Sequence, residues 1–591
     1  MNYSIKKDAK PNETIQKIKS ILNKYKIDIK VRFSAKGNFF CSTRHTISHS
    51  DIGTNGKGTS EINALASGYA ELMERLQTQW LFEYRNENFI FHADEKLVPL
   101  CNYTDAIIQN DFKNSNFNQK NIEKLISLFF FFSEDRKKRL GDNVSTIPFV
   151  SYKTKKIEYL STFLIELING TNGLSSGNTY EEACVQGLSE IIERYCTREI
   201  FSKKIKLPLI PKDCYEKYEK IKNLIKEIEN IGYKITIKDA SLGKNFPTFC
   251  CIFEDIKKNK NTIIVKFGSH PYLPIALERT LTEFLQGYND YIKNPLYPKL
   301  SVIPNSIKVR NIIWSSFVGK SCLKKTNRHL KNLLSDEADY KFNKKAWEYD
   351  ENLTNKELFN KLCKLILKHA DNIYIKNHSF LGFPTVRIYI PKFSSPYILD
   401  SYYFKNWLRA EQWVDCVKNR NLTNNMDVND LMETCKFFND TYSEIIEKNF
   451  QIGRIHIKYL GLYCAIFVRN KRQTKYYLRK VINFQSIENG TNKENLFLKT
   501  CQAYNKYYKL KWKNLSDEKI KEIIVKKYGT KLYNEIIHTI ANINYDFFKK
   551  ILQEKIVEDP IKEFNLKHEE LLGELFWQNI PDQNEIVKII D

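Results

Sequence analysis

The sequence lacks the features that mark membrane, secreted and repetitive proteins. Its longest apolar run, over residues 125–132, is far shorter than the roughly 20 residues that a membrane-spanning helix requires. Glycine and proline are scarce, at 21 and 16 of 591 residues, which excludes collagen-like and linker-like chains. The 13 cysteines form no CxxC pair and suggest no disulfide framework, and the first residues contain no apolar export signal. We therefore expect a folded cytoplasmic protein with reduced thiols and no membrane span.

Acidic residues are also in short supply relative to basic ones. Lys and Arg number 93 against 69 Asp and Glu, which gives a net charge of +24. Such a balance is often found in nucleic-acid-binding proteins. Here the excess is spread along the whole chain together with abundant Asn and Ile, as a compositionally biased genome would produce. We therefore favour a solvated basic surface over a specific nucleic-acid site, and expect salt-dependent adhesion to RNA in either case.

Hydrophobic periodicity divides the first 400 residues into units in which strands precede a helix. Together they predict an α+β region over residues 1–400. Residues 104–143 are polar and irregular around one Phe-rich helix, and are predicted to be an insertion. The expected helices cover 13–24, 61–84, 180–200 and 274–288, and the expected strands lie in a hairpin within 30–50 and at 146–168, 247–254 and 262–267.

After residue 400 the pattern becomes mainly helical. Residues 401–591 are predicted to form a TPR-like α-helical repeat or a helical bundle; the 34-residue signature of the TPR repeat is not clearly present. Residues 455–468 read either as a strand or as a buried helix. The expected helices cover 426–449, 493–510, 516–528, 530–556 and 562–577.

A glycine-rich segment, Gly53–Ser60, precedes the second predicted helix. Such a segment can direct backbone N–H groups and a lysine at phosphate oxygens. The Walker spacing fails, however, because Lys57 is followed by Gly58. A plain turn between a hairpin and a helix is therefore as good an interpretation as a phosphate-binding loop.

Paired glutamates on predicted helices give the strongest functional signal. Glu71 and Glu74 are followed by Arg75, and the same layout returns in Glu190, Glu193 and Arg194. Residues three apart lie on one helix face. A third predicted helix carries Arg279 and Glu283. A solvated helix face would explain one such pattern, but the flanking residues are small or apolar, so these stripes are predicted to be buried.

Buried carboxylates need cations, and converging glutamates suit Mg²⁺ bound together with nucleotide phosphates. Arg75, Arg194 and Arg279 suit phosphate oxygens or the orientation of the glutamates. The turn at 172–178 precedes the second acidic helix and can offer amide and hydroxyl groups to a ligand. It can equally cap that helix through Asn178 or Thr179.

Read in order along the chain, these motifs resemble the YcaO-domain family. The matching segments are Asn55–Gly58, Ala66–Arg75, Asn172–Thr179, Glu182–Arg194 and Phe267–Glu283. The resemblance implies a YcaO-type ATP-binding fold over residues 1–400 and the cofactors ATP and Mg²⁺. It also suggests a homodimer. The metal ligands that it implies are Glu71, Glu74, Glu182, Glu190 and Glu193.

The same resemblance assigns nucleotide contacts. A basic contact near the N-terminus, known in the stand-alone bacterial member, would correspond to Lys7 with Thr14. Catalytic roles are implied for Glu71, Glu190, Arg194 and Arg279. The implied ATP-binding residues are Lys7, Thr14, Ser67, Glu71, Glu74, Arg75, Ser175, Asn178, Gln186, Glu190, Arg194 and Arg279.

The activity implied is ATP-dependent activation of a peptide amide. Azoline-forming members end in a proline-rich run, whereas this chain ends in residues 579–591 without one. The resemblance therefore favours a role accessory to β-methylthiolation of ribosomal protein twelve of the small subunit, with that protein and a radical-SAM methylthiotransferase as partners. Azoline or thioamide formation on a peptide, and a non-catalytic nucleotide-sensing scaffold, are the alternatives.

Overall fold

The chain folds as two compact units, residues 1–403 with 559–591, and residues 404–558. Residues 401–591 were predicted to form one helical region, whereas the described residues 575 and 578–591 group with the first unit. The computed structural model describes residues 7–36, 39–48, 53–78, 94–112, 119–123, 126, 141–256, 262–293, 323–324, 330–347, 352–399, 428–429, 431–433, 435–436, 451–452, 455–488, 496–543, 575 and 578–591.

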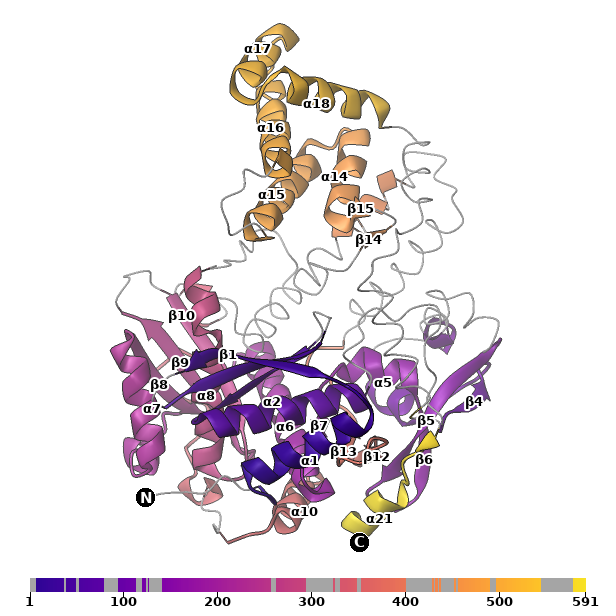
Figure 1. Cartoon of the computed structure of the whole chain (residues 1–591), viewed down its shortest axis with the longest axis vertical. Coiled ribbons are helices and arrows are strands. Elements are labelled where there is room, and N and C mark those ends of the chain that lie inside the picture. The colour runs from indigo at the N-terminus through magenta and orange to yellow at the C-terminus, as the bar shows by residue number, and fades with distance from the viewer. Residues whose placement is uncertain are drawn as a thin grey trace. The chain divides into compact units, whose positions relative to one another are not determined.

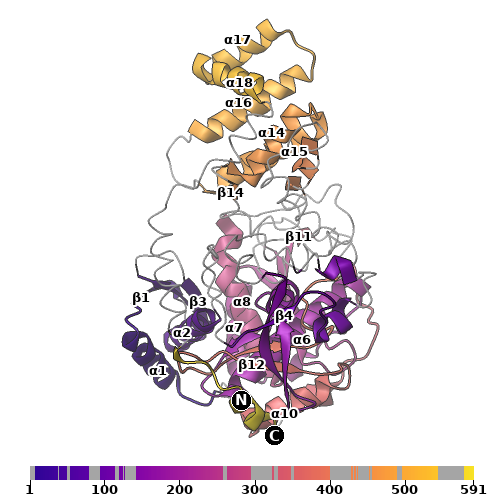
Figure 2. The same ribbon diagram turned by 90° about the vertical axis from the view of Figure 1, so that its right-hand side faces the viewer.

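A three-stranded antiparallel sheet stands near the start of the first unit. It consists of β1 (Ile29–Lys36), β2 (Cys41–Ile47) and β3 (Gly53–Gly58) in that order. Helices α1 (Pro11–Lys24) and α2 (Glu61–Gln77) pack against each other, and α2 packs on β2 and β3 (Figures 1 and 2). The predicted hairpin within 30–50 and the helix over 13–24 are confirmed.

The glycine-rich segment is a strand of this sheet and forms neither a phosphate loop nor a simple turn. Its N–H and C=O groups pair with β2 along the register from Gly53 to Gly58. The glycines allow α2 to approach closely, since a Cβ on Gly56 would lie 2.0 Å from the carbonyl oxygen of Ala64. The missing side chains of these glycines therefore allow the backbones of β3 and α2 to pack closely. The local sequence pattern does not predict this contact.

The second sheet has six strands, in the order β4–β5–β12–β13–β7 with β6 paired to β5. The prediction of strands through 146–168 was wrong in its last part, because residues 162–169 form helix α5. Its cap is local: the Ser161 hydroxyl accepts a hydrogen bond from the N–H of Leu164. The elements are β4 (Lys96–Pro99), β5 (Asn143–Ser151), β6 (Ile157–Ser161), α5 (Thr162–Asn169), β7 (Leu174–Ser176), β12 (Tyr374–Asn377) and β13 (Thr385–Tyr389).

The third sheet has the order β11–β10–β9–β8 and is covered by helices. Helix α8 packs on β9 and β10, and α7 packs on α8 and β8. The strands predicted at 247–254 and 262–267 are confirmed as β9 and β10. The elements are α7 (Glu219–Asn230), β8 (Tyr233–Asp239), β9 (Thr248–Asp255), β10 (Thr262–Ser269), α8 (Leu273–Lys293) and β11 (Leu323–Lys324).

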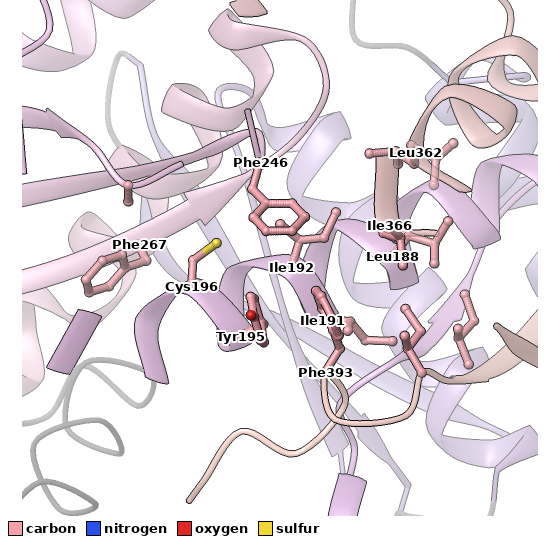
Figure 3. Close-up of a cluster of buried hydrophobic side chains, with 14 of the residues drawn as sticks. Leu188, Ile191, Ile192, Tyr195, Cys196, Phe246, Phe267, Leu362, Ile366 and Phe393 are labelled. Atoms are coloured by element: carbon pink, nitrogen blue, oxygen red, sulfur yellow. The ribbon is translucent and has the colours of Figure 1, made fainter. Parts of the chain in front are cut away.

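Helix α6 (Tyr180–Lys203) runs through the middle of the first unit and contacts two sheets, with β7 and β13 in one and β9 and β10 in the other. Helix α10 (Asn355–Ile366) also packs on α6. The main hydrophobic core surrounds α6, as Figure 3 shows for Leu188, Ile192 and Phe246. The returning helix α21 (Asn584–Ile590) contributes Ile586 to the same core.

The described part of the second unit is mainly helical. Consecutive helices pack on one another from α14 to α18. The segment that read as strand or buried helix is helical over 457–467. Most of the helices predicted at 426–449 and 562–577 lie outside the described residues, and the repeat type stays a prediction. The elements are β14 (Gln451–Ile452), β15 (Ile455–His456), α14 (Ile457–Phe467), α15 (Lys471–Glu488), α16 (Leu496–Lys511), α17 (Asp517–Tyr528) and α18 (Thr530–Asn542).

Three short helical turns complete the described elements, η1 (Ile108–Phe112), η2 (Lys212–Cys214) and η3 (Lys344–Trp347). The first lies within the predicted insertion, whose Phe-rich helix falls mainly outside the described residues. Across the part of the chain that the structure describes, every helix is too short or too polar to cross a bilayer.

Candidate active site

The first acidic stripe lies on the last two turns of α2. The N-cap Ser60 starts this helix by accepting a hydrogen bond from the N–H of Asn63. Near the end of the helix, the Arg75 guanidinium lies 3.8 Å from Glu71 and 3.4 Å from Glu74. One cation is thus shared by two carboxylates, and the side chain of Glu74 is only 13% exposed.

The second acidic stripe, on α6, repeats this arrangement closely. Arg194 lies 3.7 Å from Glu190 and 3.5 Å from Glu193. Helix α6 begins at Thr179, whose hydroxyl accepts a hydrogen bond from the N–H of Glu182, so the predicted cap is confirmed. The Glu-Glu-Arg pattern that repeats in the sequence therefore also has the same geometry in the structure.

The two stripes and α8 act electrostatically on one another. Burial, together with the nearby carboxylates of Glu71 and Glu190, raises the pKa of Glu74 to about 8. Burial also raises the pKa of Glu190, against the opposing effect of Arg194, Arg75 and Arg279. The guanidinium of Arg279 donates a hydrogen bond of 2.6 Å to the side-chain oxygen of Gln186. The structure therefore brings charged groups of α2, α6 and α8 into one neighbourhood.

The segment before α1 docks at the start of α6. The Lys7 ammonium lies 3.0 Å from Glu182, and the backbone N–H of Asp8 donates to the same carboxylate at 2.8 Å. Although burial alone would raise it, Lys7, Asp8 and Asn178 hold the pKa of Glu182 below its usual value. Thr14 joins this group by donating a 2.8 Å hydrogen bond to the side-chain oxygen of Asn178. The predicted residues Lys7, Thr14, Asn178 and Glu182 are thus in contact.

The remaining predicted residues have more local surroundings. Ser67 is half-buried on α2, one turn before Glu71. Ser175 is fully buried on β7, and its hydroxyl donates a hydrogen bond to the carbonyl oxygen of Ala183. This hydrogen bond links β7 to α6. Glu182, proposed as a metal ligand, is saturated by Lys7, Asp8 and Asn178, which makes it a link between the N-terminal segment and α6.

The fit of Mg²⁺ can be tested on this geometry. Among the described residues, no three carboxylate, imidazole or thiolate groups converge into a preformed metal site. Mg²⁺ commonly uses one or two carboxylates and takes its other ligands from phosphate and water. The raised pKa values of Glu74 and Glu190 show buried acids that a cation would favour in their ionised form. The arrangement fits Mg²⁺ that arrives with a nucleotide, and does not fit an all-protein cage.

Sequence reasoning missed Asp8 and Lys266 in this neighbourhood, and it named Lys57 and Glu283 without including them among the predicted site residues. Asp8 accepts hydrogen bonds from Thr179 and Asn355. Lys57 and Lys266 both pair with Glu283. A signal existed for Lys266, which is a single charge within the apolar strand segment 262–267.

Comparisons with known proteins decide the family. The family model described as YcaO cyclodehydratase, ATP- and Mg²⁺-binding, matches residues 55–394, which is more than half of the chain. The chain belongs to the YcaO family. The fold of the first unit is therefore the YcaO-type α+β fold, and the YcaO domain binds ATP and Mg²⁺.

Curated relatives support the same conclusion. The chain is 30% identical over 366 residues to the Escherichia coli protein named ribosomal protein S12 methylthiotransferase accessory factor YcaO, a match that covers 60% of this chain and 59% of that protein. It is also 30% identical over 376 residues to an uncharacterised protein of Haemophilus influenzae, covering 61% and 60%. The match thus spans less than two thirds of the length of both relatives.

Among solved structures, one match is YcaO from Methanopyrus kandleri bound with AMPPCP and Mg²⁺. It is 16% identical, with a TM-score of 0.42, and the alignment covers 66% of this chain and 93% of that one.

Proposed function

We propose that this YcaO protein is an ATP-hydrolysing, amide-activating enzyme that assists β-methylthiolation of ribosomal protein S12 by a radical-SAM methylthiotransferase, and that it works as a homodimer. The observation that carries the enzymatic part is the shared neighbourhood of the α2 and α6 glutamates with Arg75, Arg194 and Arg279. The name of the Escherichia coli relative supports the ribosomal part.

In the proposed mechanism, a nucleophile adds to a backbone carbonyl, and the resulting oxyanion takes the γ-phosphoryl group of ATP. The poor leaving group, an amide oxygen, thereby becomes phosphate. Glu71, Glu74, Glu190 and Glu193 would hold Mg²⁺, which would supply positive charge to the phosphate oxygens. Arg194 and Arg279 stabilise the charge that develops on the phosphoryl group, since preformed cations need little reorganisation.

The nucleotide's nucleoside end is proposed to lie toward the start of α6. Glu182 and Glu193 are separated by 11 residues of helix, or about 16 Å. Since the carboxylate-rich end suits the Mg²⁺-bound triphosphate, Lys7, Thr14 and Asn178 are left for the other end. Ser67 and Ser175 are proposed to line the site as secondary contacts.

The test is ATP turnover of the purified full chain, measured with and without the ribosomal-protein fraction of the cell. If that fraction stimulates turnover and S12 is the protein in it that binds the chain, the accessory role is supported. Turnover that the fraction leaves unchanged contradicts it.

A second candidate function is azoline or thioamide formation on a peptide, which the cyclodehydratase description of the family favours. Incubation with candidate peptides, ATP and sulfide distinguishes the two. Azoline formation removes water, a loss of about 18 Da, and thioamide formation exchanges oxygen for sulfur, a gain of about 16 Da. A nucleotide-sensing scaffold would instead bind ATP with negligible turnover.

A further inference from the structure

A partly exposed carboxylate shared by two lysines, that of Glu283, lies beside the acidic helices. Lys57 on β3 forms an ion pair with Glu283 on α8, and Lys266 on β10 lies 3.9 Å from the other oxygen of that carboxylate. These residues come from three elements that pack together, since α8 contacts both β3 and β10. The pairing is unlike that of the α2 and α6 stripes, where one arginine serves two carboxylates.

The two lysines differ in their access to a ligand. The side chain of Lys266 is 2% exposed, whereas that of Lys57 is 28% exposed. Lys57 can therefore leave Glu283 and meet an arriving anion, and Lys266 stays beside the carboxylate as its counter-ion. After this exchange of partners the carboxylate of Glu283, which is 33% exposed, still has a counter-ion in Lys266.

Lys57 lies among the charged groups of the acidic helices. Burial and the positive charges of Arg279 and Arg194 lower the pKa of Lys57 to about 8, against the opposing effect of the Glu71 and Glu193 carboxylates. All four charged groups belong to the carboxylate-rich end of the site. None of the groups at the start of α6, such as Glu182, is among the charges that act on Lys57 most strongly.

We propose that Lys57 is a further catalytic residue, which contacts the γ-phosphoryl group of ATP as that group passes to the amide oxygen. The inference rests on the proposed ATP-dependent activation and adds the wall of the site formed by β3 and α8. In the step concerned, a lone pair of the substrate oxyanion forms the new O–P bond. The bond between γ-phosphorus and the bridging oxygen breaks, and its electron pair leaves on ADP. Lys57 offsets the negative charge on the transferring group, as a charge-assisted donor does.

The experiment compares ATP·Mg²⁺ and ADP·Mg²⁺ binding by calorimetry in the full chain and in Lys57→Met. If Lys57 contacts only the γ-phosphoryl group, the variant binds ADP as the wild type does but loses affinity for ATP. The ratio of the ADP dissociation constant to the ATP dissociation constant then falls about tenfold, which is the effect of one charge-assisted hydrogen bond. ATP turnover also falls, and Lys57→Arg restores part of it. Lys96→Met, a strand lysine remote in sequence that stacks on Tyr159, is the matched control.

The outcomes separate the two proposals. If the wild type binds neither nucleotide, the proposed function fails. If the wild type binds both and Lys57→Met keeps the same ratio and turnover, the role of Lys57 is refuted and the proposed function stands. Lys57→Gln, which keeps a polar group beside Glu283, gives the same comparison should the methionine variant fail to fold.

Discussion

Replacing Glu74 by glutamine should stabilise the protein in the absence of nucleotide while impairing its site. In the folded chain the pKa of Glu74 is about 8, against an ordinary value of 4.5. The folded state therefore binds more protons than the unfolded state between these two values, so unfolding free energy is lost as the pH rises from about 4.5 to 8. At pH 7 this loss amounts to about 3 kcal/mol. Glutamine removes it, and Arg75 keeps Glu71 as a partner at 3.8 Å.

The assay is urea unfolding of the wild type and of Glu74→Gln at pH 5, 6, 7 and 8. The gain in unfolding free energy should be about 1 kcal/mol at pH 5 and reach about 3 kcal/mol near neutrality. Other groups that titrate in this range, such as Asp111 and Asp239, are present in both proteins, so the difference between the proteins removes their contribution. A difference that does not change with pH would refute the argument that Glu74 is a buried acid with a raised pKa.

Three further predictions concern packing and the N-terminal contact. Gly68→Ala should lower the unfolding free energy by about 1–3 kcal/mol in urea titrations, because a Cβ there would lie 2.1 Å from the His45 ring, whereas alanine in an unobstructed helix is stabilising. Lys7→Met should weaken ATP·Mg²⁺ binding about tenfold in calorimetry, with the exposed Lys30→Met as the control and equal affinities as the contrary result. Ile586→Ala should cost about 2–5 kcal/mol in the same urea assay, since this side chain is fully buried, and no change would argue against the docking of α21.

Much of the first unit was predictable because its helices carry strong periodicity. The acidic stripes on α2 and α6 could be placed from spacing alone, since three-residue separation fixes a shared helix face. Strand β3 could not be predicted, because Gly53–Gly58 has no hydrophobic pattern. It is stabilised by pairing with β2 and by close contact with Ala64. Helix α5 is apolar and short, and such a segment reads equally well as a strand.

The contacts of the site that could not be predicted from the sequence are those between residues far apart in the chain. The partners of Lys57 and Lys266 lie on α8, and the link between Lys57 and Glu283 spans more than two hundred residues. Local patterns carry no information on such contacts. The return of the C-terminal helix α21 to the first unit was missed for the same reason, because the core position of Ile586 depends on packing of α21 against α6 and β12.

The central claim is that glutamates of α2 and α6 jointly bind Mg²⁺ with ATP, and calorimetric titration of ATP in the presence and absence of Mg²⁺ tests it most directly. In Glu193→Gln, Mg²⁺-dependent ATP affinity should fall about tenfold or more, with the fold retained. The exposed Glu229→Gln on α7 should bind as the wild type does. Equal Mg²⁺-dependent affinity in Glu193→Gln and the wild type would contradict the claim.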